Sequence, residues 1–286
     1  MTTPPRDGSR DRRIEDPSNL YLIHPAAHAL LGRALAWRVS ANSVSIVGLL
    51  SGGMAAAAFS QWHHPAAAIV GLVFAVVWLV ADGLDGMIAR ATSTASAIGR
   101  ILDGLCDHGV FTLIYLSLAF SIGTVEAWVL AVLAGAAHAV QSSLYEGERA
   151  RFHRRVRGQP LAAAPTPTGP WFVRLYDSVA LAVDRAAMPF ERRYAAASDR
   201  EAFAAAYAAR AVPVMRLEAL LTANVRVLAI VLACLAARPS LFWWFEILPL
   251  SAICAIGLYR HRRVERGFVH ANAPVPTFLS SEQGQS

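Results

Sequence analysis

The sequence reads DGLDGMIAR at residues 82–90 and, eight residues later, GRILDGLCD at residues 99–107. Written as a pattern, this segment is D-x2-D-G-x2-A-R-x8-G-x3-D-x3-D. It places four carboxylates in or beside apolar runs: Asp82, Asp85, Asp103 and Asp107. An ionised carboxylate in such surroundings costs free energy, so it usually marks a functional site with a definite partner. We therefore expect the rest of the chain to be the scaffold that holds these four groups.

The composition indicates an integral membrane protein. The chain has 286 residues, of which 55% are hydrophobic and only 16% are charged. A soluble globular domain usually carries about 25% charged residues. The net charge is +6, and all 26 basic residues are arginines that cluster at the edges of apolar runs. This placement favours contact with anionic membrane lipids and argues against nucleic acid as a partner.

The apolar runs predict an all-α integral membrane fold with six transmembrane helices. A helix needs roughly 20 mostly apolar residues to cross a bilayer, and each of these runs comes close to that length. The six predicted spans are 42–60, 66–84, 99–121, 125–145, 217–237 and 240–259. Residues 19–39 are too interrupted by arginine to span, and they predict an amphipathic helix lying on the membrane interface, anchored by Tyr21 and Trp37.

The placement of arginine predicts the orientation. The turns at 61–65 and 121–124 contain no arginine, whereas both termini and the loops on the other side are rich in it. By the positive-inside rule the termini and the aspartate-bearing loop are cytoplasmic, and we expect a bacterial inner membrane. The predicted segments are a cytoplasmic N-terminal segment with the interfacial helix at 1–40, a catalytic core of four spans at 41–145, a cytoplasmic insert at 146–216, two spans at 217–260 and a cytoplasmic tail at 261–286.

The spacing of the aspartates suits a metal site. Asp82 and Asp85 are three residues apart, and Asp103 and Asp107 are four apart, so each pair shares one face of a helix. The short linker between the two predicted helices allows the pairs to face each other. Four facing carboxylates would repel one another, and hard oxygen ligands in this number suit two divalent ions, Mg²⁺ or Mn²⁺, that also bind phosphates.

The neighbours of the aspartates bear on the choice between a catalytic and a structural interpretation. Arg90, one turn beyond Asp85, would add a fixed cation for a phosphate, and Gly86 would let a nucleotide approach the helix closely. The structural alternative is that the aspartates form helix-end salt bridges with Arg90 and Arg100. The full pattern across two predicted helices favours the catalytic interpretation.

This pattern resembles the signature of the CDP-alcohol phosphotransferases, or CDP-alcohol phosphatidyltransferases, a family of integral membrane enzymes. The residues in register are Asp82, Asp85, Gly86, Ala89, Arg90, Gly99, Asp103 and Asp107. The resemblance implies that Asp82, Asp85 and Asp103 bind two metal ions. Asp107 would help to hold one ion and act as general base on the acceptor hydroxyl. The resemblance also implies that Gly86, Ala89 and Arg90 contact the CDP moiety.

The resemblance, which covers about residues 40–145, implies a reaction of phospholipid synthesis. A phosphatidyl group would pass from the lipid donor CDP-diacylglycerol to a polar alcohol, with release of CMP. The acceptor stays open among glycerol phosphate, inositol or its phosphate, and serine; a homodimer is expected. One alternative is transfer from a soluble CDP-alcohol to a lipid acceptor. Another is a divalent-cation transporter, which Arg90 disfavours because an arginine beside a cation path is counterproductive.

Two further arginines are candidates for binding a phosphate on the acceptor alcohol. Arg226 lies inside the fifth predicted span and therefore requires an anionic partner, either such a phosphate or one of the aspartates. Arg149 belongs to a charged cluster at the end of the fourth span, where membrane anchoring is the competing explanation. The insert that follows reads as a Pro-rich linker at 160–170 and amphipathic helices at 171–190 and 199–212, which are expected to lie on the membrane.

Overall fold

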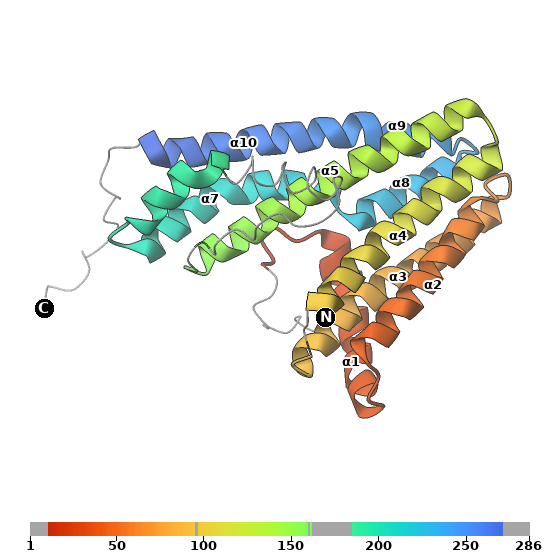
Figure 1. Ribbon diagram of the computed structural model, residues 1–286, viewed down its shortest axis with the longest axis horizontal. Coiled ribbons are helices and arrows are strands. Elements are labelled where there is room, and N and C mark those ends of the chain that lie inside the picture. Colours follow the sequence, from red (N-terminus) through yellow and green to blue (C-terminus); the bar gives the residue numbers. More distant parts are fainter. Residues whose placement is uncertain (1–10, 95–96, 160, 162–184, 271–286) are drawn as a thin grey trace, which may run out of the picture. The chain divides into compact units, whose positions relative to one another are not determined.

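The protein is built from helices in two units. The computed structural model describes residues 11–94, 97–159, 161 and 185–270, with the side chains of residues 97–107 and 270 excepted. Every regular element in this part of the chain is a helix (Figure 1). Unit 1 comprises Met1–Ser142 and Glu218–Cys254, and unit 2 comprises Ser143–Leu217 and Ala255–Ser286. The all-α prediction is therefore confirmed for the described residues.

Unit 1 consists mainly of long apolar helices. Its elements are η1 (Asn19–Ile23), α1 (His24–Ala36), α2 (Ala41–Phe59), α3 (Pro65–Ala91), α4 (Ala97–Ile122), the first part of α5 (Val125–Val156), η2 (Ala219–Leu221), α8 (Ala223–Leu235), α9 (Ser240–Phe245), η3 (Glu246–Leu250) and the start of α10 (Ser251–His270). Figure 1 shows α2, α3 and α4 side by side, and α2 packs against both of the others.

Local sequence signals explain where several of these helices begin and end. The hydroxyl of Ser40 accepts a hydrogen bond from the backbone N–H of Ser43 at 3.1 Å and so caps the start of α2. Pro65 begins α3, at a position where the missing N–H would have no helical partner. Gly123 separates α4 from α5 with a φ of +72°, a conformation that glycine adopts without strain.

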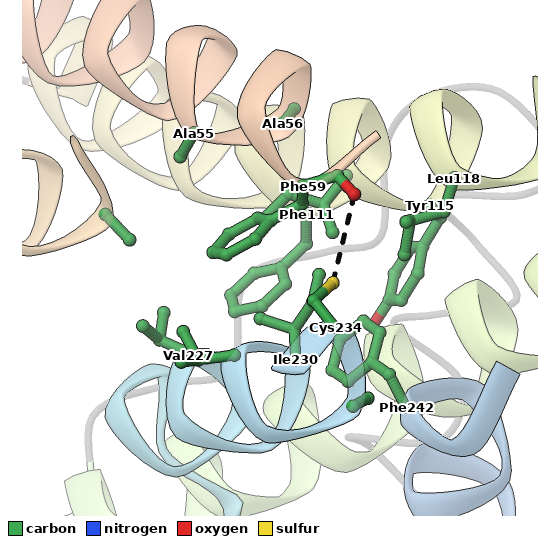
Figure 2. Close-up of a cluster of buried hydrophobic side chains, with 14 of the residues drawn as sticks. Ala55, Ala56, Phe59, Phe111, Tyr115, Leu118, Val227, Ile230, Cys234 and Phe242 are labelled. Carbon is green, nitrogen blue, oxygen red and sulfur yellow. Dashed lines mark hydrogen bonds between the residues drawn. The ribbon is translucent and has the colours of Figure 1, made fainter. Parts of the chain in front are cut away.

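The core of unit 1 is an apolar cluster between α2, α3, α4, α5, α8 and α9 (Figure 2). Helices approach closely at glycines: a Cβ on Gly52 would lie 2.2 Å from Cγ2 of Val110, and one on Gly71 would lie 2.5 Å from Cε1 of Phe59. The thiol of Cys234 lies 3.8 Å from the carbonyl oxygen of Phe59. Cys234 and Cys254 are both buried thiols, and a thiol in such surroundings packs as a small apolar side chain.

In the part of the chain that the structure describes, four helices are long and apolar enough to cross a membrane: Ala41–Phe59, Pro65–Ala91, Val125–Val156 and Ser240–Val269. A bent pair, Arg200–Leu221 with Ala223–Leu235, makes a fifth if it counts as one span, and His108–Ile122 is a shorter apolar segment of α4. Six spans are thus not confirmed. The fifth predicted span, 217–237, is not one helix, because Thr222 is extended with a ψ of 157° and separates η2 from α8.

The leading segment is helical from Asn19 to Ala36, three residues short of the predicted range 19–39, and its amphipathic character is not confirmed. The π-helical turn η1 runs directly into α1, and Ala27 is fully buried. The predicted anchors Tyr21 and Trp37 are 68% and 77% exposed. Their exposure leaves them free to contact lipid, and the interfacial position of this helix stays a prediction.

Unit 2 is a helical unit built around aromatic side chains. It consists of the later part of α5, helical residues 185–195, α7 (Arg200–Glu218) and most of α10. The aromatic side chains that contact one another there include Phe152, Phe190, Tyr194, Phe203, Tyr207 and Phe268. Helix α5 continues to Val156, past the predicted end of the fourth span at 145, because its last turns are buried inside this unit. Residues 162–184 lie outside the described residues, and with them the start of the predicted helix at 171–190.

A fully buried arginine lies at the centre of unit 2. The guanidinium of Arg155 donates to Glu191 at 2.8 Å and to the hydroxyl of Tyr207 at 3.0 Å, and it lies 2.7 Å from Glu265. It also lies 4.4 Å from the ring centroid of Phe190. These contacts join α5, residues 185–195, α7 and α10 through one side chain. The positive charge is thereby paired and hydrogen-bonded, as burial requires.

We expect Arg155→Met to loosen unit 2. Removing one partner of a buried ion pair typically costs about 3–5 kcal/mol, because a carboxylate is left buried without its counter-charge. Hydrogen–deuterium exchange of the detergent-solubilised protein should show faster exchange across residues 185–195. Arg192→Met, at an exposed position in the same helical stretch, is the matched control and should exchange like the wild type. Equal exchange in the two variants would contradict the central role of Arg155.

Candidate active site

The first aspartate pair lies in the C-terminal half of α3. Asp85 is 4% exposed and Asp82 is partly buried, and α3 continues past them to Ala91. The linker between the predicted spans 66–84 and 99–121 is accordingly shorter, since α3 ends at Ala91 and α4 begins at Ala97. The helix keeps both carboxylates on one side because they are three residues apart. Two closely spaced carboxylates, one of them buried, therefore project from a single apolar helix.

A serine from the neighbouring helix holds the buried carboxylate. The hydroxyl of Ser45 on α2 donates to Oδ2 of Asp85 at 2.5 Å. Ser45 is itself 7% exposed, so this bond is shielded from water. Sequence reasoning missed Ser45, because a serine in an apolar helix carries no signal that distinguishes it from one that bonds its own backbone.

Small residues let other helices approach α3 at the aspartates. A Cβ on Gly83 would lie 3.5 Å from Cβ of Ala27 on α1, and one on Gly48 of α2 would lie 3.3 Å from Cβ of Ala81. Helix α1 thus packs against α3 between Asp82 and Asp85.

The predicted nucleotide contacts form the last turns of α3. Gly86 and Ala89 are partly buried, and Arg90 is exposed. A methyl group placed on Gly86 would lie 3.3 Å from Nη1 of Arg90, so the guanidinium lies back along the helix over this glycine. A cation is therefore held within one turn of Asp85, as a phosphate-binding arginine would require.

The second aspartate pair belongs to α4. Asp103 and Asp107 lie within the first half of this helix, one turn apart, but their side chains are outside the described residues. The meeting of the two pairs thus stays a prediction. Where the side chains of α4 are described, the helix packs on α3: the rings of Trp78 and Phe111 meet edge to face with centroids 5.4 Å apart.

Arg226 is 1% exposed, and each of its three guanidinium nitrogens has a partner inside unit 1. Its guanidinium pairs with Glu246, donates to Oε1 of Gln141 at 2.9 Å, and donates through Nε to the carbonyl of Leu221 at 3.2 Å. The required anionic partner is therefore Glu246, in the π-helical segment η3. Sequence reasoning missed Glu246, although a carboxylate in the apolar run 241–250 carries the same signal as the aspartates. A role for Arg226 in binding an acceptor phosphate stays a prediction.

Gln141 connects this ion pair to a wider polar network. Its amide nitrogen donates to the backbone carbonyl of Glu246 at 2.9 Å and to the hydroxyl of Ser251 at 3.0 Å. On the other side, Nδ1 of His138 lies 3.9 Å from Oε1 of Glu246 and 3.1 Å from the hydroxyl of Tyr115. The network joins α4, α5, α8, η3 and α10, and it fixes their mutual register within unit 1.

Arg149, the other candidate for an acceptor phosphate, lies in unit 2. Its Nη1 is 3.7 Å from a carboxylate oxygen of Glu146 one turn earlier on α5. Such a loose pair between partly exposed side chains contributes little to stability. A phosphate-binding role for Arg149 stays a prediction as well.

Among the described side chains, one group has possible ligand atoms close enough together to hold a metal ion, all within 4.8 Å of one another. It consists of Glu148, His261 and Glu265, which all lie in unit 2. Its carboxylates are already bound by arginines. Glu148 accepts from Arg151 at 2.9 Å and pairs with Arg262, which also pairs with Glu265. The guanidinium groups that already occupy these carboxylates would repel a divalent cation at short range. The group is therefore an ion-paired structural core and a poor metal site.

The same core changes the acidity of a neighbouring carboxylate. Burial would raise the pKa of Glu191, but the hydrogen bond from Arg154 and the charge of Arg155 lower it, and the resulting pKa lies below the ordinary glutamate value. Glu191 is thus ionised at neutral pH and its ion pairs stabilise unit 2. Because this pKa is depressed on folding, that stabilisation is lost as the pH falls through it.

Comparison with known proteins identifies the class. A protein-family model described as CDP-alcohol phosphatidyltransferase matches residues 38–173, a range that contains the whole aspartate pattern. The comparisons with curated proteins and with solved structures found no match.

Residues 38–173 therefore belong to the CDP-alcohol phosphatidyltransferase family, and the chain is a transferase of substituted phosphate groups. Members of this family use CDP-alcohol donors and alcohol acceptors and generally depend on a divalent metal. The several apolar helices of this chain are consistent with an integral membrane protein.

Proposed function

We propose that the protein transfers a phosphatidyl group from CDP-diacylglycerol to a polar alcohol in a metal-dependent reaction that releases CMP. The observation that carries this proposal is the unbroken aspartate pattern within the matched residues, with Asp85 buried and held by Ser45 at the end of an apolar helix. A headgroup alcohol such as glycerol phosphate, inositol, inositol phosphate or serine is the acceptor.

The residues at the end of α3 fit a divalent ion. Asp82 and Asp85 supply hard oxygen donors on one helix face, and the buried position of Asp85 excludes much of the competing water. We assign Asp82, Asp85, Asp103 and Asp107 as the ligands of two Mg²⁺ or Mn²⁺ ions. When bound, these ions neutralise charge on the transferred phosphoryl group and on the leaving oxygen.

The other steps fall to residues of the chain. Arg90, with Gly86 and Ala89, binds the CDP moiety and holds the pyrophosphate at the end of α3. Asp107 takes the proton from the acceptor hydroxyl while that oxygen forms a bond to the phosphorus that carries diacylglycerol. The bond from this phosphorus to the bridging oxygen breaks, and the electron pair leaves with CMP.

The location of the reaction is also proposed. In this proposal the protein has six membrane spans, of which α4 is the third. The leading helix lies on the membrane interface. The arginine distribution supports cytoplasmic termini and an active site at the cytoplasmic face of a bacterial inner membrane. We propose a homodimer, in keeping with the resemblance.

The decisive assay uses purified protein, CDP-diacylglycerol and a panel of alcohols. CMP release is expected with at least one acceptor, to stop with EDTA, and to return with Mg²⁺ or Mn²⁺, because the aspartates require the ions. A parallel arm offers soluble CDP-alcohols with diacylglycerol. The absence of metal-dependent CMP release in both arms would refute the proposed activity, and ion flux into proteoliposomes would then indicate a transporter.

A further inference from the structure

The contact between Ser45 and Asp85 is built into the packing of two helices. Gly48 lies one turn after Ser45 on α2, and Ala81 lies one turn before Asp85 on α3. A Cβ on Gly48 would lie only 3.3 Å from Cβ of Ala81, so the backbones are close at this level. Because the helices run antiparallel, this approach brings the hydroxyl of Ser45 within reach of the carboxylate one turn further along.

The hydroxyl has a clear preferred acceptor. A serine hydroxyl carries one proton, and Oδ2 of Asp85 is 2.5 Å away, whereas the carbonyl of Ala41 is 3.2 Å away. A hydrogen bond to an ionised acceptor is shorter and stronger than one to a neutral carbonyl. The hydroxyl of Ser45 therefore donates its hydrogen bond to Asp85.

We propose that Ser45 is a positioning residue of the metal site: its hydrogen bond to Oδ2 fixes the orientation of the Asp85 carboxylate as a metal ligand. This inference rests on the proposed function. Ser45 itself touches neither substrate nor metal in this assignment. Hydrogen bonds that orient ligating groups matter strongly, and their loss typically lowers metal affinity or activity about 10–100-fold.

The test compares Mn²⁺ binding by three variants, followed through the free-ion EPR signal without substrate. Ser45→Ala is expected to raise the Kd for Mn²⁺ by about 10-fold or more. Ser45→Thr keeps the hydroxyl, so its Kd for Mn²⁺ should lie within about 3-fold of the wild-type value. This change is smaller than the change of about 10-fold or more that follows the loss of such a hydrogen bond. Ser43→Ala removes an exposed hydroxyl from the same helix, two residues away, and should leave the Kd unchanged.

A second measurement separates positioning from a general structural defect. If Ser45 acts through metal binding, Mn²⁺ at saturating concentration restores most of the CMP release of Ser45→Ala. An unchanged Kd in Ser45→Ala, or a Kd in Ser45→Thr as high as in Ser45→Ala, would overturn the inference. Wild-type protein that neither binds Mn²⁺ nor releases CMP would instead refute the proposed function.

Discussion

Asp107→Asn should abolish turnover while binding of the nucleotide largely survives. Asparagine keeps the size of the side chain and its ability to accept a hydrogen bond, but it cannot take a proton from the acceptor hydroxyl. General-base catalysis typically contributes about 10²–10⁴-fold to a rate, and the lost ligand charge adds to this effect. Arg90 and the small residues at the end of α3 remain in place, so the CDP moiety keeps its contacts.

The rate is measured as CMP release with the acceptor identified in the panel, and nucleotide binding by calorimetry with CDP. Asp199→Asn is a suitable control, because Asp199 caps α7 in unit 2 through a 2.9 Å hydrogen bond from the N–H of Ala202. This control should retain activity. Wild-type rates in Asp107→Asn would remove Asp107 as the base.

Substitutions in the buried pair of Arg226 and Glu246 should produce a large change in stability. The two side chains are 1% and 0% exposed, so removal of either leaves a charge in an apolar interior. For Arg226→Met or Glu246→Leu we expect a loss of about 3–5 kcal/mol in the free energy of unfolding. Combining the two should recover much of the loss, since no unpaired charge then remains.

This double-mutant cycle can be measured by denaturant unfolding of the protein in detergent micelles. Arg238→Met, at an exposed arginine in the turn before α9, should lie within about 0.5 kcal/mol of the wild type. Strict additivity of the two core substitutions would show that the pair is not coupled. It would also reopen the assignment of Glu246 as the partner of Arg226.

Features that depend on neighbouring residues were predictable from the sequence. Apolar runs predicted helices in the positions of α2, α3, α4 and α5. The spacing of Asp82 and Asp85 placed both on one face of α3. The capping serine and Pro65 mark where α2 and α3 start. Each of these follows from helical periodicity or backbone hydrogen bonding within a few residues, so no distant part of the chain is needed to predict it.

Features that depend on distant residues could not be predicted. Glu246 was not foreseen as the partner of Arg226, because the pairing depends on how α8 and η3 pack. The continuation of α5 to Val156 was missed for a similar reason. Its charged last turns look like a polar loop until the buried contacts of Arg155 in unit 2 are known. In both cases a charge that seemed to need solvent or substrate is neutralised by a residue far away in the sequence.

The segment at residues 82–107 illustrates the same division. By itself the sequence determined the chemistry available there: four carboxylates, an arginine one turn beyond the first pair, and glycines, all carried by apolar helices. Only the tertiary structure decided that Asp85 is buried, that Ser45 orients it and that α1 packs at Gly83. The reason is physical: residue types and short-range periodicity are local properties, whereas burial and the direction of a carboxylate depend on which helices pack beside it.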